Sequence, residues 1–368
     1  MKKIVSTLAA VLMIMAALFQ PKALSASSAV LYDPLTKTVV AGVQDNVQRG
    51  MASTTKIMTA LVALELYELD QVVEIQPEWC GAEGSSMYLR AGEKLTVSDL
   101  LYGLMLSSGN DAAVALSCIY SGNSDDFVGL MNTKALELGL TNTHFDNPNG
   151  LDSETHYSTA RDMAVLTAAA MENEAFREIV STKSIQIGER YLNNHNKLLS
   201  MLDGAEGVKT GFTKKCGRCL VSSASRMGRR LIAVTLNASD DWNDHISLMN
   251  QGFERFETRT VLSAGEIGSI TVAAGERCRT VGLYIEEDFT YALAEDEQPV
   301  VTLCGPRIVY GPIDGGQQYG TVRIALGNTV LAELPVYFTE GVAVTLREKS
   351  SWEQMTDWFK DLWELLGF

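Results

Sequence analysis

Residues 52–59 read Ala-Ser-Thr-Thr-Lys-Ile-Met-Thr, and they open the first strong helical pattern of the chain, which covers residues 53–66. Residues 29–42 alternate in polarity on either side of a turn, as two paired strands do. The stretch at 52–59 therefore predicts a junction between a sheet and a helix. A spacing of three residues places the Ser53 hydroxyl and the Lys56 amine on the same helix face, within hydrogen-bond reach.

Ser53 and Lys56 are a candidate nucleophile and base. A lysine amine activates a serine only when it is neutral, so we expect Lys56 in a dry site beside a second positive charge. A helix start also leaves the Ser53 backbone N–H free to donate to an oxyanion. Alone, S-x-x-K is a weak signal, since about one chance match is expected in a chain of this size. A serine N-cap followed by a surface lysine is the simpler interpretation of that motif.

Ser108-Gly109-Asn110 is a second motif. It lies in a short break between a helix that ends near Leu106 and one that starts at Asp111. A tight turn of this kind presents a hydroxyl and an amide to a cleft. An ordinary linker between two helices is the alternative interpretation of this motif alone.

Lys209-Thr210-Gly211 is a third motif and falls inside a predicted strand. A bare glycine is costly there unless a partner approaches the backbone closely, and an extended peptide that pairs with an edge strand is such a partner. In this order, S-x-x-K, S-x-N and K-T-G form the set found in β-lactamases and penicillin-binding proteins. The set predicts serine acyl transfer.

The remaining pattern predicts two folded domains, because 368 residues exceed one typical core. Strands at 29–42 and 207–237 enclose a mostly helical middle, which fits one sheet with a helical insertion. Residues 267–344 are strand-like, with turn clusters between the strands, and predict an all-β domain. We expect a catalytic domain at 27–260 and the all-β domain at 265–346.

The N-terminal residues predict export. Lys2 and Lys3 precede an apolar run at residues 4–19 and a stretch of small residues, which together are typical of a signal peptide at 1–26. A single membrane anchor is the alternative, although the apolar run is short for a bilayer span. We expect the protein at the outer face of the cytoplasmic membrane or in the cell-wall space.

The formal net charge of −15 makes nucleic acid a poor candidate partner. The six cysteines show no zinc-like pair of pairs. Cys216 and Cys219 form one C-x-x-C between predicted strands, which we interpret as a turn with two unreactive cysteines. His144, His195 and His245 show no metal-ligand spacing. We therefore predict no metal and no other cofactor.

Residues 351–368 predict an amphipathic helix with a wide aromatic face. Its main apolar residues stand three or four apart: Trp352, Met355, Phe359, Leu362 and Leu366. The acidic residues outnumber Lys360, which is the wrong sign for attraction to anionic lipid, so binding to a membrane surface would rest on apolar burial. Packing against another subunit is the alternative interpretation.

The chain resembles the serine D-alanyl-D-alanine carboxypeptidases, which are penicillin-binding proteins of low molecular mass. The resemblance covers nearly the whole mature chain. It is carried by residues 52–59, Glu83-Gly84-Ser85-Ser86-Met87, and residues 101–113, 156–163 and 207–213. It implies an α/β fold like that of penicillin-binding proteins and β-lactamases, with an antiparallel sheet flanked by helices, a helical subdomain and a small all-β domain after it.

The resemblance also implies a reaction. Ser53 would attack the carbonyl between the two D-alanines that end a peptidoglycan stem peptide, while Lys56 takes its proton, and water would later free the acyl-enzyme. Ser108 would relay a proton toward the leaving amine, and Asn110 would hold the substrate or Lys56. A β-lactam resembles the same dipeptide, so penicillin should acylate Ser53 and remain bound.

The resemblance implies substrate contacts on the third motif. Lys209 and Thr210 would meet the terminal carboxylate, beside Gly211, and the N–H groups of Ser53 and Phe212 would form the oxyanion hole. Relatives often have histidine at the position of Phe212. With phenylalanine there, this chain keeps the backbone N–H donor but loses any polar contact of the side chain.

Two further positions bear on this resemblance. Some relatives supply an arginine toward the carboxylate from the segment that reads Asn-Ala-Ser-Asp-Asp-Trp-Asn-Asp at 237–244 in this chain. His156 lies in a matching stretch, but the lysine mechanism does not need it, and we expect it to be structural.

Two other functions share part of this pattern. A class A β-lactamase has the three motifs and the core fold, but it usually has aspartate where Gly109 stands and lacks an all-β domain. A catalytically idle protein that binds cell-wall peptide would not need Ser53, Lys56, Ser108 and Lys209 together. Neither the preferred stem peptide nor the balance between hydrolysis and transpeptidation follows from the sequence.

Overall fold

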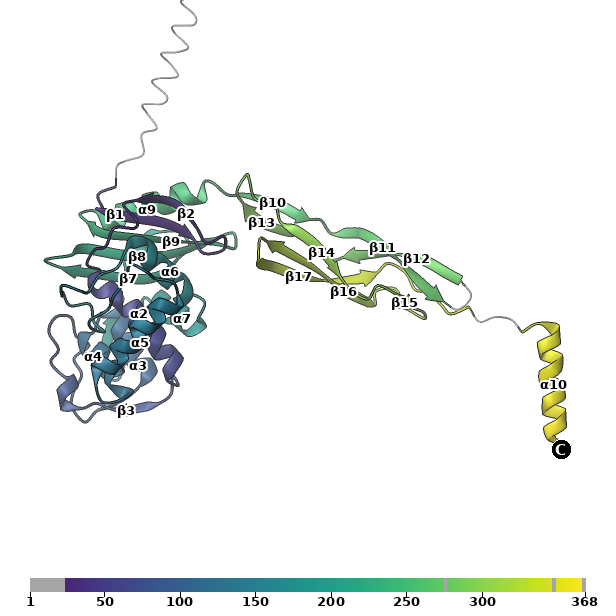
Figure 1. Ribbon diagram of the computed structural model, residues 1–368, viewed down its shortest axis with the longest axis horizontal. Coiled ribbons are helices and arrows are strands. Elements are labelled where there is room, and N and C mark those ends of the chain that lie inside the picture. Colours follow the sequence, from purple (N-terminus) through teal and green to yellow (C-terminus); the bar gives the residue numbers. More distant parts are fainter. Residues whose placement is uncertain (1–23, 275–276, 346–348, 366–368) are drawn as a thin grey trace, which may run out of the picture. The chain divides into compact units, whose positions relative to one another are not determined.

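The computed structural model describes residues 24–274, 277–345 and 349–365. The chain divides into two compact units, residues 1–255 and 256–368 (Figure 1). Most of the predicted signal peptide, up to residue 23, lies outside the described residues.

A five-stranded antiparallel sheet in the order β2-β1-β9-β8-β7 forms the base of the first unit. Its strands are β1 (Ser28–Asp33), β2 (Thr38–Val43), β7 (Ala205–Thr213), β8 (Gly217–Arg226) and β9 (Arg229–Ala238). Strands from both ends of the unit thus share one sheet, as predicted. The strand with the K-T-G motif, β7, lies at the edge of this sheet, where an extended peptide can pair with it.

Side chains of the sheet alternate between two helical layers, as the period of two requires. Val30 and Val234 point into the large apolar core that also holds the helices of the insertion. Leu31, on the opposite face, lies against α9 (Asp241–Phe253), where a Cβ on Gly252 would come within 2.3 Å of Leu31 Cδ2. Figure 1 shows α6 and α9 on opposite sides of the sheet.

The helical insertion surrounds α2, which is buried through its first eight residues. A helix that is apolar on all sides belongs in the middle of a core. Its helices are α2 (Lys56–Leu66), α3 (Val97–Leu106), α4 (Asn110–Ile119), α5 (Ser124–Glu137), α6 (Ala160–Ala170), α7 (Glu174–Ser181) and the short α8 (Leu198–Met201).

The predicted helix at 53–66 begins differently from our expectation. Residues Ala52–Thr55 form a 3₁₀ turn, η1, and the α-helix starts only at Lys56. Short elements complete the unit: η2 (Pro77–Trp79) and the pairs β3 (Val72–Glu74) with β4 (Lys94–Thr96) and β5 (Ser184–Ile187) with β6 (Arg190–Asn193).

The second unit contains the predicted all-β domain, which has its own apolar core around Val281, Ile324 and Val336. Its main sheet has the order β14-β16-β17-β12-β11-β15, and β10 pairs with β13. The strands are β10 (Glu257–Leu262), β11 (Gly265–Ala274), β12 (Arg277–Ile285), β13 (Phe289–Leu293), β14 (Val300–Cys304), β15 (Val309–Tyr310), β16 (Gln318–Leu326) and β17 (Thr329–Phe338).

The unit also contains the amphipathic helix α10 (Ser351–Leu365). Among the described residues, no helix combines the length and the apolar character that crossing a bilayer requires.

Candidate active site

The amine of Lys56 is buried at the junction between η1 and α2 and meets three oxygen atoms. Its Nζ lies 3.0 Å from Ser53 Oγ, 2.7 Å from Asn110 Oδ1 and 2.6 Å from the backbone oxygen of Asn149. The serine contact follows from the spacing of three residues, whereas the other two come from segments 54 and 93 residues away. The fold therefore supplies most of the lysine's surroundings.

This geometry suits a neutral lysine that acts as a base. Asn110 Oδ1 and the Asn149 carbonyl can only accept hydrogen bonds, so a neutral amine donates its two protons to them. The lone pair then faces Ser53 Oγ, and the serine hydroxyl donates to Nζ. This arrangement places a proton acceptor in direct contact with the hydroxyl that would attack.

Electrostatics favour the neutral form of Lys56. Burial is the main cause that holds its pKa well below the usual range for lysine, and the nearby charge of Lys209 lowers it further. The Asp111 carboxylate acts in the opposite direction and is the weaker influence. Burial also lowers the pKa of Lys209 to about 7. The dry site with a second positive charge is present.

The turn that carries Ser108 and Asn110 is fixed by the carboxylate of Asp111. This fully buried group accepts from the backbone N–H of Met87 at 3.0 Å, from that of Leu89 at 3.0 Å and from the Ser86 hydroxyl at 2.5 Å. Asp111 thus joins the second motif to residues 86–89. The loop and the motif therefore form one rigid wall beside Ser53.

Asn110 is oriented by hydrogen bonds on both ends of its amide. Its Nδ2 donates to the backbone oxygen of Glu83 at 2.5 Å, so its Oδ1 points to Lys56. Of the two roles that the resemblance left open for Asn110, the structure shows the contact with Lys56. Ser108 has a left-handed backbone with φ +57°, a strained conformation for a residue with a Cβ that is often found at functional sites.

Two glycines let other segments approach the nucleophile. A Cβ on Gly211 would come within 3.0 Å of the Ser53 backbone nitrogen, so β7 lies directly against the start of η1. Gly150 has φ +88°, and a Cβ there would come within 2.1 Å of the Ala52 oxygen. The loop with Gly150 and the K-T-G strand thus both require a bare backbone beside Ser53.

Ser53 and Gly211 border a cleft of about 390 Å³. Its lining is Ser53, Ser85, Ser108, His195, Lys197, Thr210, Gly211, Phe212, Arg218, Asp241 and Trp242. The structure therefore brings Ser53, Ser108 and the strand residues of the third motif together around one hollow. Lys209 lies below this surface, since only 1% of it is exposed.

His156 is buried behind the nucleophile and is neutral, because burial lowers its pKa to about 4. Its Nδ1 accepts from the Asp146 N–H at 3.0 Å, so Nε2 carries the proton and donates to Thr55 Oγ1 at 2.8 Å. The Thr55 hydroxyl in turn donates to the Ala52 oxygen. These bonds connect His156 to η1, and its structural role stays a prediction.

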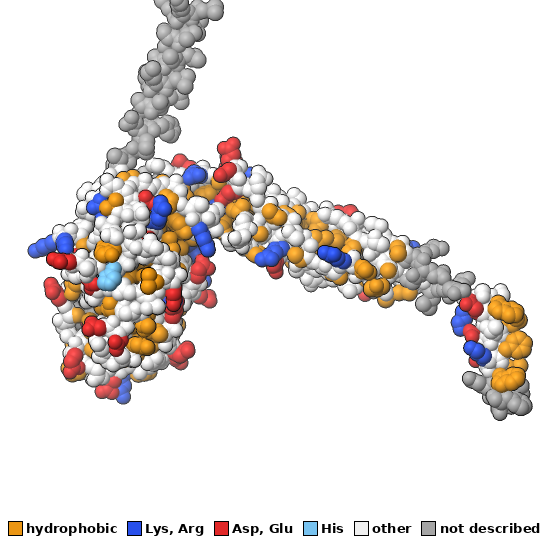
Figure 2. Space-filling view, viewed as in Figure 1, with side chains coloured by type: hydrophobic (Ala, Val, Ile, Leu, Met, Phe, Trp, Pro, Cys, Tyr) orange, Lys and Arg blue, Asp and Glu red, His pale blue; other side chains and the backbone are white. Residues whose placement is uncertain are grey.

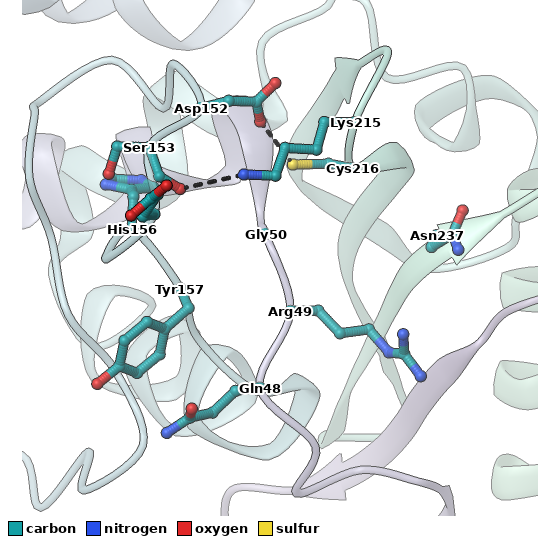
Figure 3. Close-up of a pocket in the computed structure, with 11 residues that line it drawn as sticks. Gln48, Arg49, Gly50, Asp152, Ser153, His156, Tyr157, Lys215, Cys216 and Asn237 are labelled. Carbon is teal, nitrogen blue, oxygen red and sulfur yellow. Dashed lines mark hydrogen bonds between the residues drawn. The ribbon is translucent and has the colours of Figure 1, made fainter.

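A second hollow, of about 370 Å³, lies beside Gly50 and is shown in Figure 3. Along its rim Cys216 Sγ lies 2.9 Å from Asp152 Oδ1, which also accepts from Thr213 Oγ1. These bonds tie the turn between β7 and β8 to the loop that follows Gly150. Burial raises the pKa of the Cys216 thiol and that of Cys219, the latter to about 12, which favours the protonated form of both thiols.

Comparison with known proteins matches this arrangement to one family. The family model described as D-alanyl-D-alanine carboxypeptidase matches residues 15–240. The chain belongs to the serine D-alanyl-D-alanine carboxypeptidase family. A second model, described as the C-terminal domain of penicillin-binding protein 5, matches residues 256–344 of this carboxypeptidase.

Individual relatives agree with the family match. The D-alanyl-D-alanine carboxypeptidase DacF of Bacillus subtilis is 32% identical over 91% of this chain and 90% of its own length. The structure of penicillin-binding protein 5 from Haemophilus influenzae has a TM-score of 0.63 at 30% identity, covering 88% of this chain and 99% of that one. DacD of Francisella tularensis has a TM-score of 0.61 at 27% identity, over 89% and 95% of the two chains. The predicted fold and family are confirmed.

Sequence reasoning missed several residues of the site. No motif in the sequence connects Asn149, whose carbonyl accepts from Lys56, or Gly150, which lies beside Ser53, with the nucleophile. The signal was the Asn-Pro-Asn-Gly run at 147–150, whose turn chemistry was visible but whose neighbour in space was not. Arg218 and Trp242 carried no motif at all.

Proposed function

We propose that Ser53 of this carboxypeptidase removes the terminal D-alanine from peptidoglycan stem peptides through an acyl-enzyme. The observation that supports this best is the set of Lys56 contacts. Two fixed acceptors occupy the protons of a neutral amine and leave its lone pair for the Ser53 hydroxyl.

The proposed acylation begins when Ser53 Oγ gives its proton to Lys56 and attacks the carbonyl carbon between the two D-alanines. The N–H groups of Ser53 and Phe212 stabilise the oxyanion. The proton then passes through Ser108 to the leaving amine, the C–N bond breaks and D-alanine departs. Water, deprotonated by Lys56, frees the shortened peptide and restores the serine.

A β-lactam ring presents a similar carbonyl group and keeps its leaving amine attached, so we propose that penicillins acylate Ser53 and are released slowly. The turn at Gly109 favours this over β-lactamase activity. Class A β-lactamases usually have aspartate at the corresponding position, whereas a Cβ on Gly109 would come within 2.9 Å of Asp111 Oδ1 and 3.2 Å of the Gly103 oxygen.

The nucleophile is tested with fluorescent penicillin. We expect one covalent label per protein chain and none on the Ser53→Ala variant, with a loss of at least about 1,000-fold in acylation rate. The reason is that, among the described residues, Ser53 carries the hydroxyl that is hydrogen-bonded to Lys56. The control is Ser181→Ala, on the exposed surface of α7. Undiminished labelling of Ser53→Ala would contradict the assignment.

The reaction is tested with a pentapeptide that ends in D-Ala-D-Ala, by following its mass. Loss of one alanine residue by the wild type, and not by Ser53→Ala, is the expected result. Turnover of penicillin at many cycles per second without a stable adduct would instead indicate a β-lactamase.

We also propose that α10 attaches the exported protein to the outer face of the cytoplasmic membrane. Figure 2 shows hydrophobic side chains gathered along one side of this helix. Its exposed apolar residues are Trp352, Met355, Trp358, Phe359, Trp363 and Leu365. Aromatic side chains of this kind bind the lipid interface by apolar burial, which suits a helix whose polar side is acidic.

Deletion of residues 351–368 tests this attachment. We expect the shortened protein to stay in the supernatant when neutral phosphatidylcholine vesicles are sedimented, while the full chain sediments with them. Both should release D-alanine from a soluble peptide at the same rate, because the cleft lies entirely in the first unit. Equal sedimentation of the two proteins would contradict membrane attachment and favour packing against another subunit.

A further inference from the structure

We propose that Arg218 binds the terminal carboxylate of the substrate. This inference rests on the proposed carboxypeptidase function. A carboxypeptidase must recognise a free carboxylate next to the bond that it cuts, and an arginine guanidinium is the side chain best shaped to do so. Arg218 lies in β8 directly opposite Phe212 of β7, and it lines the same cleft as Ser53 and Thr210.

Lys209 is a poor sole partner for that carboxylate. Its side chain is almost fully buried, and its Nζ donates to the Thr210 backbone oxygen at 2.8 Å. Burial lowers its pKa to about 7, so Lys209 is a weaker cation than an exposed lysine. A guanidinium keeps its charge at every pH at which proteins fold, and the Arg218 side chain is 43% exposed.

The guanidinium of Arg218 is held by the first two residues of α9. Its Nε lies 3.0 Å and its Nη2 2.8 Å from Asp241 Oδ1, and its carbon lies 5.7 Å from the centre of the Trp242 ring. These contacts involve two of the three guanidinium nitrogens, so Nη1 has donors beyond the pair. A planar group fixed on two sides presents its remaining edge with little loss of entropy when an anion binds.

The charge of Asp241 bears on this proposal. Asp241 is buried, and both Arg218 contacts converge on one of its oxygens, so it neutralises part of the guanidinium charge. The cleft also contains Lys197 and His195, whereas Asp241 is its sole carboxylate among the lining residues. The field at this end of the cleft therefore still favours an anion.

The sequence around the start of α9 is consistent with carboxylate binding by Arg218 of β8. The segment at 237–244 contains no basic residue. It supplies an acid and an aromatic ring, which are the two groups that position an arginine from the neighbouring strand. The structure thus provides a cation at the start of α9, although the local sequence lacks one.

The test compares Arg218→Leu with Arg226→Leu. Arg226 also belongs to β8, and its guanidinium carbon lies 4.6 Å from the centre of the Phe253 ring of α9. Arg226 does not line the cleft. Both substitutions therefore remove an arginine that packs on an aromatic side chain, but only one removes it beside Ser53.

Each variant is assayed with a peptide that ends in D-Ala-D-Ala and with the same peptide as its C-terminal amide. We expect Arg218→Leu to lower kcat/KM about 10- to 100-fold for the free acid and to leave that for the amide within about twofold. Arg226→Leu should leave the ratio of the two substrates unchanged. An equal loss on both substrates would show that Arg218 only holds the fold, and would overturn the proposal.

A second measurement keeps this test independent of peptide turnover. The rate of acylation by benzylpenicillin, which has a free carboxylate, is compared with that by its methyl ester. Arg218→Leu should slow the acid and not the ester. A wild type that is acylated but releases no D-alanine would contradict the proposed function alone, whereas an unchanged acid-to-ester ratio in the variant would contradict the role of Arg218.

Discussion

Two buried lysines, Lys56 and Lys209, lie at the centre of the site, and their positive charges repel each other. Lys209 is one cause of the low pKa of Lys56, second to burial, so its charge favours the neutral base. This coupling has a functional consequence, because acylation requires Lys56 without its proton. The rate should rise with pH through the pKa of Lys56.

The substitution Lys209→Gln should move this rise toward higher pH. Removing a neighbouring positive charge raises the pKa of Lys56, so less of the amine is neutral at a given pH, and we expect a shift of about one pH unit. The measurement is the pH profile of penicillin acylation. Lys197→Gln removes a charge from the same cleft and should leave the profile in place. Identical profiles for both variants would refute the coupling.

Two segments approach Ser53 closely at glycines, which have no side chain. The loop with Gly150 lies against η1, and β7 approaches from the other side at Gly211. Helices and strands position the side chains that take part in the chemistry, but these two contacts set how closely the elements approach. A side chain added at either glycine would therefore displace the segment that carries Ser53.

The substitution Gly150→Ala should displace the start of η1. The added Cβ meets the Ala52 oxygen, in a left-handed backbone that alanine disfavours, and we expect a loss of about 2 to 4 kcal/mol in the free energy of unfolding together with slower penicillin acylation.

The matched control is Gly122→Ala, since Gly122 also has a positive φ, +79°, but open space around its Cβ. It should cost about 1 kcal/mol from backbone strain alone and leave acylation unchanged. Thermal unfolding and acylation kinetics of both variants check this. Equal losses would mean that the contact with η1 has no effect.

The whole molecule consists of two units with separate apolar cores. All residues of the cleft belong to the first unit. We therefore expect the second unit to take no direct part in the reaction.

A protein that ends at residue 255 should therefore fold and react with penicillin at the rate of the full chain, within about twofold. The physical reason is that the apolar core of the first unit is built from its own side chains. The measurement is acylation by fluorescent penicillin, with circular dichroism as the check on folding. A folded but unreactive protein would show that the site depends on the second unit.

The sequence by itself determined the local parts of this protein. The spacing of Ser53 and Lys56, the break at Ser108-Gly109-Asn110 and the strand pattern around Lys209 are short-range signals, and together they predicted the family and the fold. The strand patterns of residues 29–42 and 207–237 likewise predicted one sheet, because strand periodicity is a property of neighbouring residues. The pattern predicted a helix from Ser53, whereas the α-helix starts three residues later, at Lys56.

Only the tertiary structure decided what surrounds these parts. The Asn149 carbonyl reaches Lys56 across 93 residues of chain, and Arg218 takes its place at the cleft through pairing of β8 with β7 and through Asp241. Such contacts join residues that are distant in sequence, and their distances depend on how the helices pack on the sheet. A single sequence carries no local signal for them, so the groups that tune the base and bind the carboxylate become visible only in the folded chain.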